Sequence, residues 1–240
     1  MSISYINLIM EKYSRKRKIL FFIFTFIAGY LLFIFPNLFF GITKWNGGLN
    51  GINLFYTALF QFLTVTLLVK FALSKVGHKL DFIGMKFKAS DLWIGVAVGL
   101  SWTALQFLII IPNTGGVERP DVAAMIDMQK GGIIALLSYI ALGVIGGGIT
   151  EEIFNRGYFI NALKEVFYNP KIGLYFASFL SIIFFIAGHL PSNQIALIDI
   201  TIPTLAYTLL FITTRRLTAP IIAHGLYNML AIILVYYLYD

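Results

Sequence analysis

The sequence predicts an all-α protein: a polytopic bundle of seven or eight transmembrane helices. Of its 240 residues, 59% are hydrophobic and only 12% are charged, whereas a soluble domain has about 25% charged residues. Apolar windows of bilayer length, about 20 residues, recur along the chain. The chain has no cysteine, which excludes disulfides, thiolate nucleophiles and Cys-ligated metals. The net charge of +7 indicates membrane topology and contact with anionic lipid, not nucleic-acid binding.

The first span follows a basic segment, residues 11–18. Its apolar run ends in Phe35-Pro36-Asn37 and lacks a small-residue cleavage site, so we interpret it as an uncleaved span and not as a signal peptide. The seven windows, in chain order, are Ile19–Phe35, Ile52–Leu73, Leu92–Ile111, Gly131–Thr150, Ile172–Leu190, Ile195–Thr213 and Ala219–Leu238. An eighth apolar window, which a larger relative would carry, is not visible in the sequence. Without an internal repeat, we expect one membrane domain over residues 1–240.

The basic residues predict the orientation of the bundle. If the N-terminus is inside, fifteen of the 18 Lys and Arg lie in cytoplasmic segments, and only Lys44, Arg119 and Lys130 lie outside. Cytoplasmic loops carry an excess of Lys and Arg. We therefore expect a cytoplasmic N-terminus and an external loop at Pro112–Lys130, and the composition of this multi-pass protein favours a bacterial plasma membrane.

Two adjacent carboxylates mark the end of the fourth window. Glu151 and Glu152 follow the run Gly146–Thr150, and Arg156 comes one helical turn later. A charge at membrane depth costs roughly 2.5–3.5 kcal/mol on insertion scales, so it is rarely kept without a function. On a helix, Glu152 and Arg156 can pair at i and i+4, while Glu151 points about 100° away. That separation suits a general acid or base. The alternative is a charged helix end at the membrane surface.

Two histidines lie on or beside later apolar windows. His189 ends a Phe-x-x-x-His segment that begins at Phe185, and His224 and Asn228 share one helix face at i and i+4. Each has a structural alternative: His189 as an interfacial or capping residue, and the second pair as a buried polar contact. Asp199, inside the sixth window, also needs a partner.

The three elements occur in the order Glu-Glu-x-x-x-Arg, Phe-x-x-x-His and His-x-x-x-Asn. This ordered set resembles the CPBP family of intramembrane proteases, which includes CAAX prenyl endopeptidases and bacterial Abi and bacteriocin-immunity proteins. The resemblance covers about residues 131–235, which we expect to be the catalytic core, and no motif position is missing. The N-terminal half carries no comparable resemblance.

The resemblance implies a glutamate-dependent endopeptidase whose active site lies inside the bundle and opens to the cytoplasm. Glu151 would activate a water for attack on a peptide carbonyl, while Glu152 with Arg156 would fix the helix and tune the charge. The histidines would position the water, and the last motif would stabilise the oxyanion. The implied catalytic residues are Glu151, Glu152, Arg156, His189, His224 and Asn228.

The cofactor is a separate question, because the family has been described both as metal-dependent and as metal-free. Glu151, His189 and His224 are a sufficient ligand set for zinc or another divalent metal. However, the pattern His-x-x-x-His is absent, and neither histidine has an evident second carboxylate to orient it, since Glu152 is assigned to Arg156. We therefore favour a site without a cofactor.

The spacing around the predicted turn at Asn169-Pro170 supports part of the site. Glu151 lies 19 residues before Pro170 and His189 lies 19 after it, so two antiparallel helices bring them to one height. The helix of Glu151 must then continue through Phe167, beyond the fourth window. His224 does not fit, because straight helices place it near the cytoplasmic end of the seventh span. The open solutions are strong tilt, a break at Pro203 and a re-entrant segment near Pro191.

The sequence is compatible with three functions. The favoured one is an intramembrane endopeptidase acting on membrane-associated or lipidated peptides, such as CAAX-like, pheromone or bacteriocin precursors. The alternatives are a non-catalytic immunity or regulatory protein on the same scaffold, and a small transporter with a Glu/His proton relay. The richness in Lys, Ile, Phe and Asn suits a low-GC bacterium, where prenylation is not expected, so pheromone or bacteriocin processing, or self-immunity, is preferred. The expected partners are the bilayer and a peptide.

Overall fold

The computed structural model describes residues 14–239, so Lys12 of the basic N-terminal segment lies outside the described part. Within that part every regular element is a helix. Seven of these helices are long and apolar enough to cross a membrane. The predicted all-α bundle with seven spans is therefore confirmed, and the protein is a multi-pass membrane protein.

The spans, in chain order, are α2 (Arg15–Thr43), α3 (Ile52–Lys75), α4 (Ala89–Leu105) with its continuations η3 (Gln106–Ile110) and α5 (Ile111–Asn113), α7 (Ile133–Ala141) with its continuations η5 (Leu142–Ile160) and α8 (Asn161–Lys164), α9 (Pro170–Gly188), α10 (Gln194–Thr214) and α11 (Thr218–Tyr239). The connections contain η1 (Trp45–Gly47), η2 (Leu80–Ile83), η4 (Gly116–Glu118) and α6 (Pro120–Gln129).

Local signals set several helix ends. Side-chain oxygens of Ser14, Asn169 and Asn193 accept backbone N–H groups at the starts of α2, α9 and α10. Lys44 and Arg215 end α2 and α10 in the left-handed conformation, which lets their N–H groups bond back to the last turn.

The fourth span differs most from its apolar window. It runs from Ile133 to Lys164, 32 residues, whereas the window ends at Thr150. Its middle part, η5, is a π-helix with i→i+5 hydrogen bonds, and most of its second half is buried. Hydropathy underestimates the span because the charged residues that end the window lie inside the bundle. The helix that the spacing argument required to reach Phe167 ends at Lys164.

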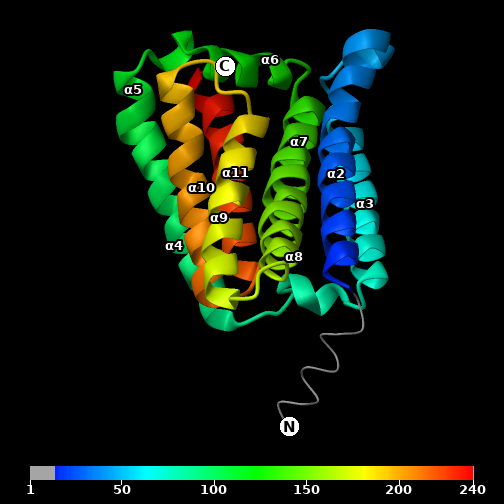
Figure 1. Cartoon of the computed structure of the whole chain (residues 1–240). Coiled ribbons are helices and arrows are strands. Elements are labelled where there is room, and N and C mark those ends of the chain that lie inside the picture. The colour runs from blue at the N-terminus through cyan, green and yellow to red at the C-terminus, as the bar shows by residue number, and fades with distance from the viewer. Residues whose placement is uncertain (1–13, 240) are drawn as a thin grey trace.

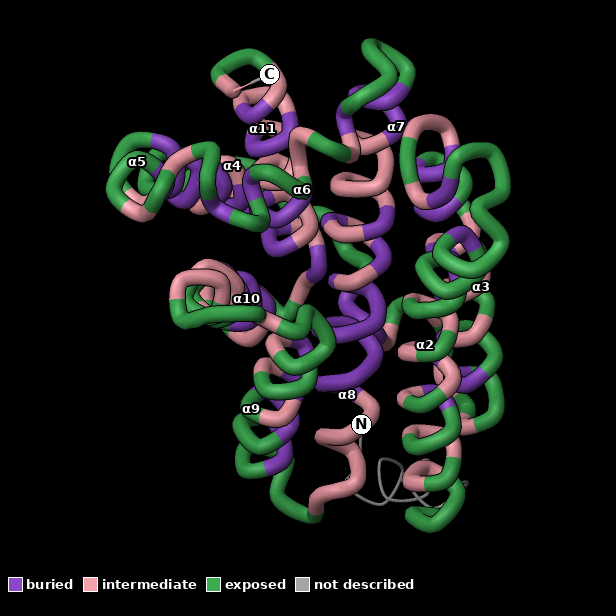
Figure 2. Tube along the Cα trace, turned by 90° about the horizontal axis from the view of Figure 1, so that it is seen from above, coloured by how far each residue is buried: buried purple, intermediate pink, exposed green. Residues whose placement is uncertain are grey.

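Figure 1 shows the α7–η5–α8 span between the α2–α3 pair and the group α4, α9, α10 and α11. The start of α2, η2 and α8 lie at one end, here called the base; α6 and the α9–α10 connection lie at the opposite end, here called the top. The tube coloured by burial in Figure 2 is buried mainly along this central span. The span packs against α3, α9 and α11, so residues on η5 are held at the centre of the bundle.

Close packing of α4 against α11 depends on Gly95 and Gly99. A Cβ atom would lie 2.7 Å from the Ala219 carbonyl oxygen at Gly95, and 2.9 Å from the Ala223 carbonyl oxygen at Gly99. Such contacts leave no room for a side chain, so the small-residue face allows the two backbones to approach.

The α10–α11 turn at the base lies deeper in the bundle than the end of α8. Leu217, between α10 and α11, is buried and its N–H donates to the Gly84 carbonyl at 3.0 Å. Leu217 also packs on Gly157, so α11 begins about two helical turns above the end of α8. This height brings His224 to the centre of the bundle. It does so without a break at Pro203, because α10 is continuous from Gln194 to Thr214.

Most basic side chains of the described residues lie at the base, but the orientation count placed one of them, Arg156, wrongly. Arg156, which the orientation count assigns to a cytoplasmic loop, is fully buried inside the bundle. It therefore reports nothing about topology. The remaining asymmetry still favours the base as the cytoplasmic end, and the orientation stays a prediction.

Candidate active site

Glu152 lies at the centre of the site, and its side chain is fully buried. Its Oε1 accepts a hydrogen bond from Arg156 Nη1 at 2.9 Å and lies 2.9 Å from His224 Nδ1. The predicted i, i+4 pair is confirmed, and the alternative of a charged helix end at the membrane surface is wrong. Because Arg156 stays charged, we assign Glu152 as its ionised counter-ion; a carboxylate offers only acceptors, so His224 Nδ1 carries a proton.

Glu151, the adjacent residue, has different surroundings. Its side chain is 21% exposed, and its Oε2 is buried without a hydrogen-bond partner. His189 Nε2 lies 4.0 Å from this oxygen, while His189 Nδ1 donates to the Phe185 carbonyl at 2.8 Å. A separation of 4.0 Å is too long for a direct hydrogen bond and suits one bridging water. The predicted equal height of Glu151 and His189 is confirmed.

The third motif faces the same space across Gly147. Asn228 Nδ2 donates to the Gly143 carbonyl at 2.9 Å. A Cβ at Gly147 would lie 2.6 Å from Asn228 Nδ2 and 3.6 Å from His224 Nε2. These two side chains therefore share one face of α11, as predicted, and they reach the surface of η5 one turn before Glu151.

The ring of Phe185 joins the motifs. It lies 4.2 Å from Arg156 Cζ, and its centroid is 4.5 Å from that of His189 and 6.3 Å from that of His224. The guanidinium over the ring makes a cation–π contact. Phe185 thus separates the buried charges from the cavity while it orients both imidazoles.

Three polar residues near the site were missed by the motif argument. Tyr207 stacks on His224 with 4.9 Å between ring centroids, and both Tyr207 Oη and Tyr30 Oη are buried without a partner. Gln61 donates to the Phe33 carbonyl at 3.2 Å and approaches η5. Tyr30 and Gln61 come from the N-terminal half, which carries no resemblance. Gln61 could have been identified from the sequence, since a polar side chain inside an apolar span usually has a structural or functional role.

Three cavities meet at Glu151 and His189. The first, about 420 Å³, reaches α6 at Met125 and Met128. The second, about 310 Å³, extends to Pro191 and also contains His224 and Asn228. The third, about 590 Å³, lies between α2 and α9 and includes Tyr30, Phe33, Ile34, Asn37 and Leu190.

All three cavities lead toward the top or the side of the bundle, because α6 and the α9–α10 connection lie at the top (Figure 1). The predicted cytoplasmic N-terminus and the implied opening to the cytoplasm are therefore incompatible in this fold. The N-terminal end of α2 is at the base, opposite the openings.

Asp199, a carboxylate inside the sixth apolar window, has polar partners in the fold, as expected. Gln106 Nε2 donates to its Oδ1 at 2.9 Å, and Arg119 pairs with both Asp199 and Asp121. Burial raises the pKa of Asp121, but the hydrogen bond and charge of Arg119 outweigh it, so this pKa lies below its usual range. The network attaches the 114–132 loop to α10 beside the second cavity.

The residues proposed for a metal do not form a ready cluster. Among residues 14–239, no group of three or more His, Asp or Glu side chains is arranged to hold a metal ion. However, the expectation that neither histidine has a carboxylate to orient it is wrong for His224. Glu152 orients His224 as well as Arg156, so this histidine does have a carboxylate partner of the kind that supports a zinc ligand. The preference for a site without a cofactor stays a prediction.

The comparisons with known proteins concern the same segment. Residues 133–230 match the family described as "Type II CAAX prenyl endopeptidase Rce1-like". No curated protein and no solved structure matches the chain. The matched segment contains every residue of the three motifs, and the family supports CAAX-type intramembrane protease activity. The match confirms the resemblance seen in the motifs: residues 133–230 are similar to the Rce1-like CAAX prenyl endopeptidases.

Proposed function

We propose that this protein is an intramembrane endopeptidase in which Glu151 activates a water molecule for attack on a peptide carbonyl. One observation carries the proposal. Glu151 Oε2 is buried without a hydrogen-bond partner, at the meeting point of three cavities and 4.0 Å from His189 Nε2. A carboxylate oxygen and an imidazole nitrogen at this spacing can hold one water between them.

In the proposed reaction, Glu151 accepts a proton from the water as its oxygen bonds to the peptide carbon. His189 is held by the Phe185 carbonyl through Nδ1, so its Nε2 is left to orient the water. The proton on Glu151 then passes to the amide nitrogen as the C–N bond breaks. Glu151 thereby acts first as general base and then as general acid.

The negative charge that develops on the carbonyl oxygen needs donors. Asn228 uses one amide hydrogen on the Gly143 carbonyl and keeps a second one. Glu152 orients His224 through Nδ1, which directs its Nε2 toward the same space. These preorganised donors form the proposed oxyanion site, and removing one such donor typically costs ~10²–10³-fold in rate.

We further propose that the substrate is a peptide with an apolar segment that enters from the top, beside α2 and α9. The cavity between these helices has Phe33 and Ile34 on one side and Leu190 on the other, which suits a chain still partly in lipid. Because the basic residues favour the base as cytoplasmic, the top would face outside. A peptide precursor on the outer side of a bacterial membrane fits this entry.

The proposal is tested by Glu151→Gln, which keeps the side-chain shape but removes the base. Purified protein in liposomes is incubated with a farnesylated CAAX-type peptide and with an unmodified signal-peptide-like peptide, and new termini are identified by mass spectrometry. We expect the variant to lose at least ~10²-fold in cleavage rate while keeping the wild-type unfolding temperature. The matched control is Glu118→Gln, an exposed carboxylate at the top, which should cleave normally. Cleavage at the wild-type rate by Glu151→Gln rejects Glu151 as the base.

The same assay separates the alternatives. A non-catalytic immunity or regulatory protein cleaves neither peptide, with or without Glu151. A transporter with a proton relay loses transport, not cleavage, on the same substitution.

A further inference from the structure

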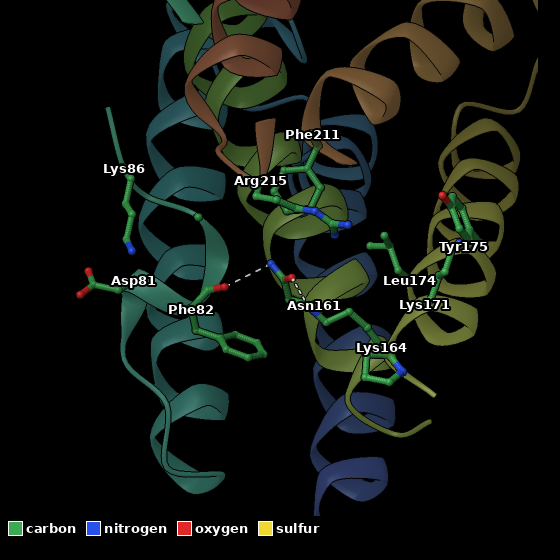
Figure 3. Close-up of a pocket in the computed structure, with 12 residues that line it drawn as sticks. Asp81, Phe82, Lys86, Asn161, Lys164, Lys171, Leu174, Tyr175, Phe211 and Arg215 are labelled. Carbon is green, nitrogen blue, oxygen red and sulfur yellow. Dashed lines mark hydrogen bonds between the residues drawn. The ribbon is translucent and has the colours of Figure 1, made fainter. Parts of the chain in front are cut away.

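A further cavity, here called the basal cavity, lies at the base of the bundle, away from the candidate active site. It has a volume of about 680 Å³ and is formed by η2 and the following loop, α8, the start of α9 and the end of α10 (Figure 3). Buried Ile83 and Leu217 pack around Gly157 between this cavity and the centre of the bundle. The two sites are therefore separate, and residues of the proposed cleavage reaction do not line this one.

The cavity carries a strong excess of positive charge. Its charged lining residues are Lys86, Lys164, Lys171, Arg215 and Asp81. Lys164 makes only a long hydrogen bond to Asn161 Oδ1, at 3.4 Å. Within residues 14–239, Lys86, Lys171 and Arg215 make no ion pair. Four cations thus face one carboxylate.

Some other basic groups at the base are paired with carboxylates, unlike the cations of the cavity. Lys18 and His78 both bind Glu165 at 2.9 Å. Arg216, next to Arg215 in the chain, makes two hydrogen bonds to the buried Asp91. The left-handed conformation at Arg215 turns this residue from the last turn of α10 toward the cavity, while Arg216 holds the α10–α11 turn.

The cavity also has apolar walls and lies at interfacial depth. Leu174, Tyr175 and Phe211 line it beside the cations. Trp93 and Tyr168, at the same end of the bundle, are 72% and 90% exposed, as aromatic residues are where a bilayer meets water. Basic pockets between helices on the cytoplasmic side bind lipid headgroups with several negative charges.

We propose that this basal cavity binds the headgroup of a phospholipid with two phosphates. The bound headgroup would connect η2, the α8–α9 turn and the end of α10. The phosphates meet Lys164, Lys171 and Arg215, and the acyl chains follow the exposed apolar face of α9. The proposal goes beyond the cleavage reaction and does not depend on it.

Lipid binding to purified wild-type protein is measured by native mass spectrometry with cardiolipin, phosphatidylglycerol and phosphatidylcholine. Cardiolipin should bind most tightly and phosphatidylcholine least. In K171Q/R215Q the cardiolipin affinity should fall by ~30-fold, since each basic residue near an anionic surface contributes about a factor of five. The charge-matched control K70Q/K79Q, which changes exposed lysines at the same end outside the cavity, should lose less than about threefold.

A second pair, K86Q/K171Q, changes only exposed side chains and repeats the test if Arg215 proves necessary for folding. Both cavity pairs should keep the wild-type cleavage rate. Equal losses in the cavity and control pairs would mean diffuse surface attraction and would overturn the proposal. Displacement of cardiolipin by millimolar inorganic phosphate would identify a free-phosphate site, and would likewise overturn it.

Discussion

Glu151 and Glu152 are neighbours in the chain, yet their environments are opposite. Glu152 is fully buried and shares one oxygen between Arg156 and His224. Glu151 is partly exposed, and its Oε2 has no hydrogen-bond partner. On a helix, consecutive side chains point in different directions, so one position faces the packed centre and the next faces the cavities. Of two identical groups, only one is therefore free to react, while the other positions the reacting residues.

The largest expected difference between Glu151 and Glu152 concerns catalysis. Glu151→Gln should lower the cleavage rate by at least ~10²-fold and leave the fold intact.

The next effect concerns stability. Glu152→Ala leaves Arg156 buried without a counter-ion, and breaking a buried pair in this way costs about 3–5 kcal/mol. Glu151→Ala should cost less than about 1 kcal/mol, because the side chain is partly exposed and its Oε2 makes no hydrogen bond. Thermal unfolding in detergent measures both, with Glu152→Leu/Arg156→Leu as a variant that removes both charges and should recover part of the loss. Equal destabilisation by the two single Ala variants would contradict the comparison.

Gly147→Ala tests the cavity side of the site, where Asn228 lies. The added methyl would lie 2.6 Å from Asn228 Nδ2, so the amide must move away from the proposed oxyanion position. We expect a loss of ~10²-fold in rate with a destabilisation of only about 1–3 kcal/mol. Gly41→Ala, which meets nothing within 4 Å, is the control. A normal rate in Gly147→Ala would show that Asn228 does not contact the transition state.

The orientation of the site is tested with single cysteines, since the chain contains none of its own. Val117→Cys, at the top, should react with a membrane-impermeant maleimide in intact cells, whereas Lys79→Cys, at the base, should react only after lysis. The physical reason is the excess of basic residues at the base. The reverse pattern would place the cavities on the cytoplasmic side and change the expected substrate.

The smallest effect belongs to Glu165, a third carboxylate just past the same helix. Burial raises its pKa, but His78 and Lys18 lower it more, so its pKa lies below the usual value. A lowered pKa in the folded state adds stability above the unfolded pKa of about 4.3, and this stability is lost as the pH falls through the folded value. Glu165→Gln should flatten that acid-side loss by less than about 1 kcal/mol, as seen in unfolding curves between about pH 6 and 3. An unchanged slope would mean that the pair contributes nothing.

Much of the site could be predicted because its spacing is local. The Glu152–Arg156 pair follows from i, i+4 geometry, and the meeting of Glu151 with His189 follows from equal distances to one turn. Tyr207 could not be predicted, because its role depends on how α10 packs against His224. Tyr30 is similar: it lies in the first span and reaches the third cavity only through the packing of α2.

Hydropathy and motif spacing are properties of the chain alone, and they were sufficient to predict the seven-span all-α class and the resemblance to CAAX proteases. The contact of His224 with Glu152, and the course of the cavities toward the top or the side of the bundle, follow only from how the helices pack. Both depend on the depth at which the α10–α11 turn is seated, and Leu217, Gly84 and Gly157 set that depth by contacts between distant segments. Hydropathy gives the length of a helix but not its height relative to a neighbour, because that height is fixed by side-chain packing.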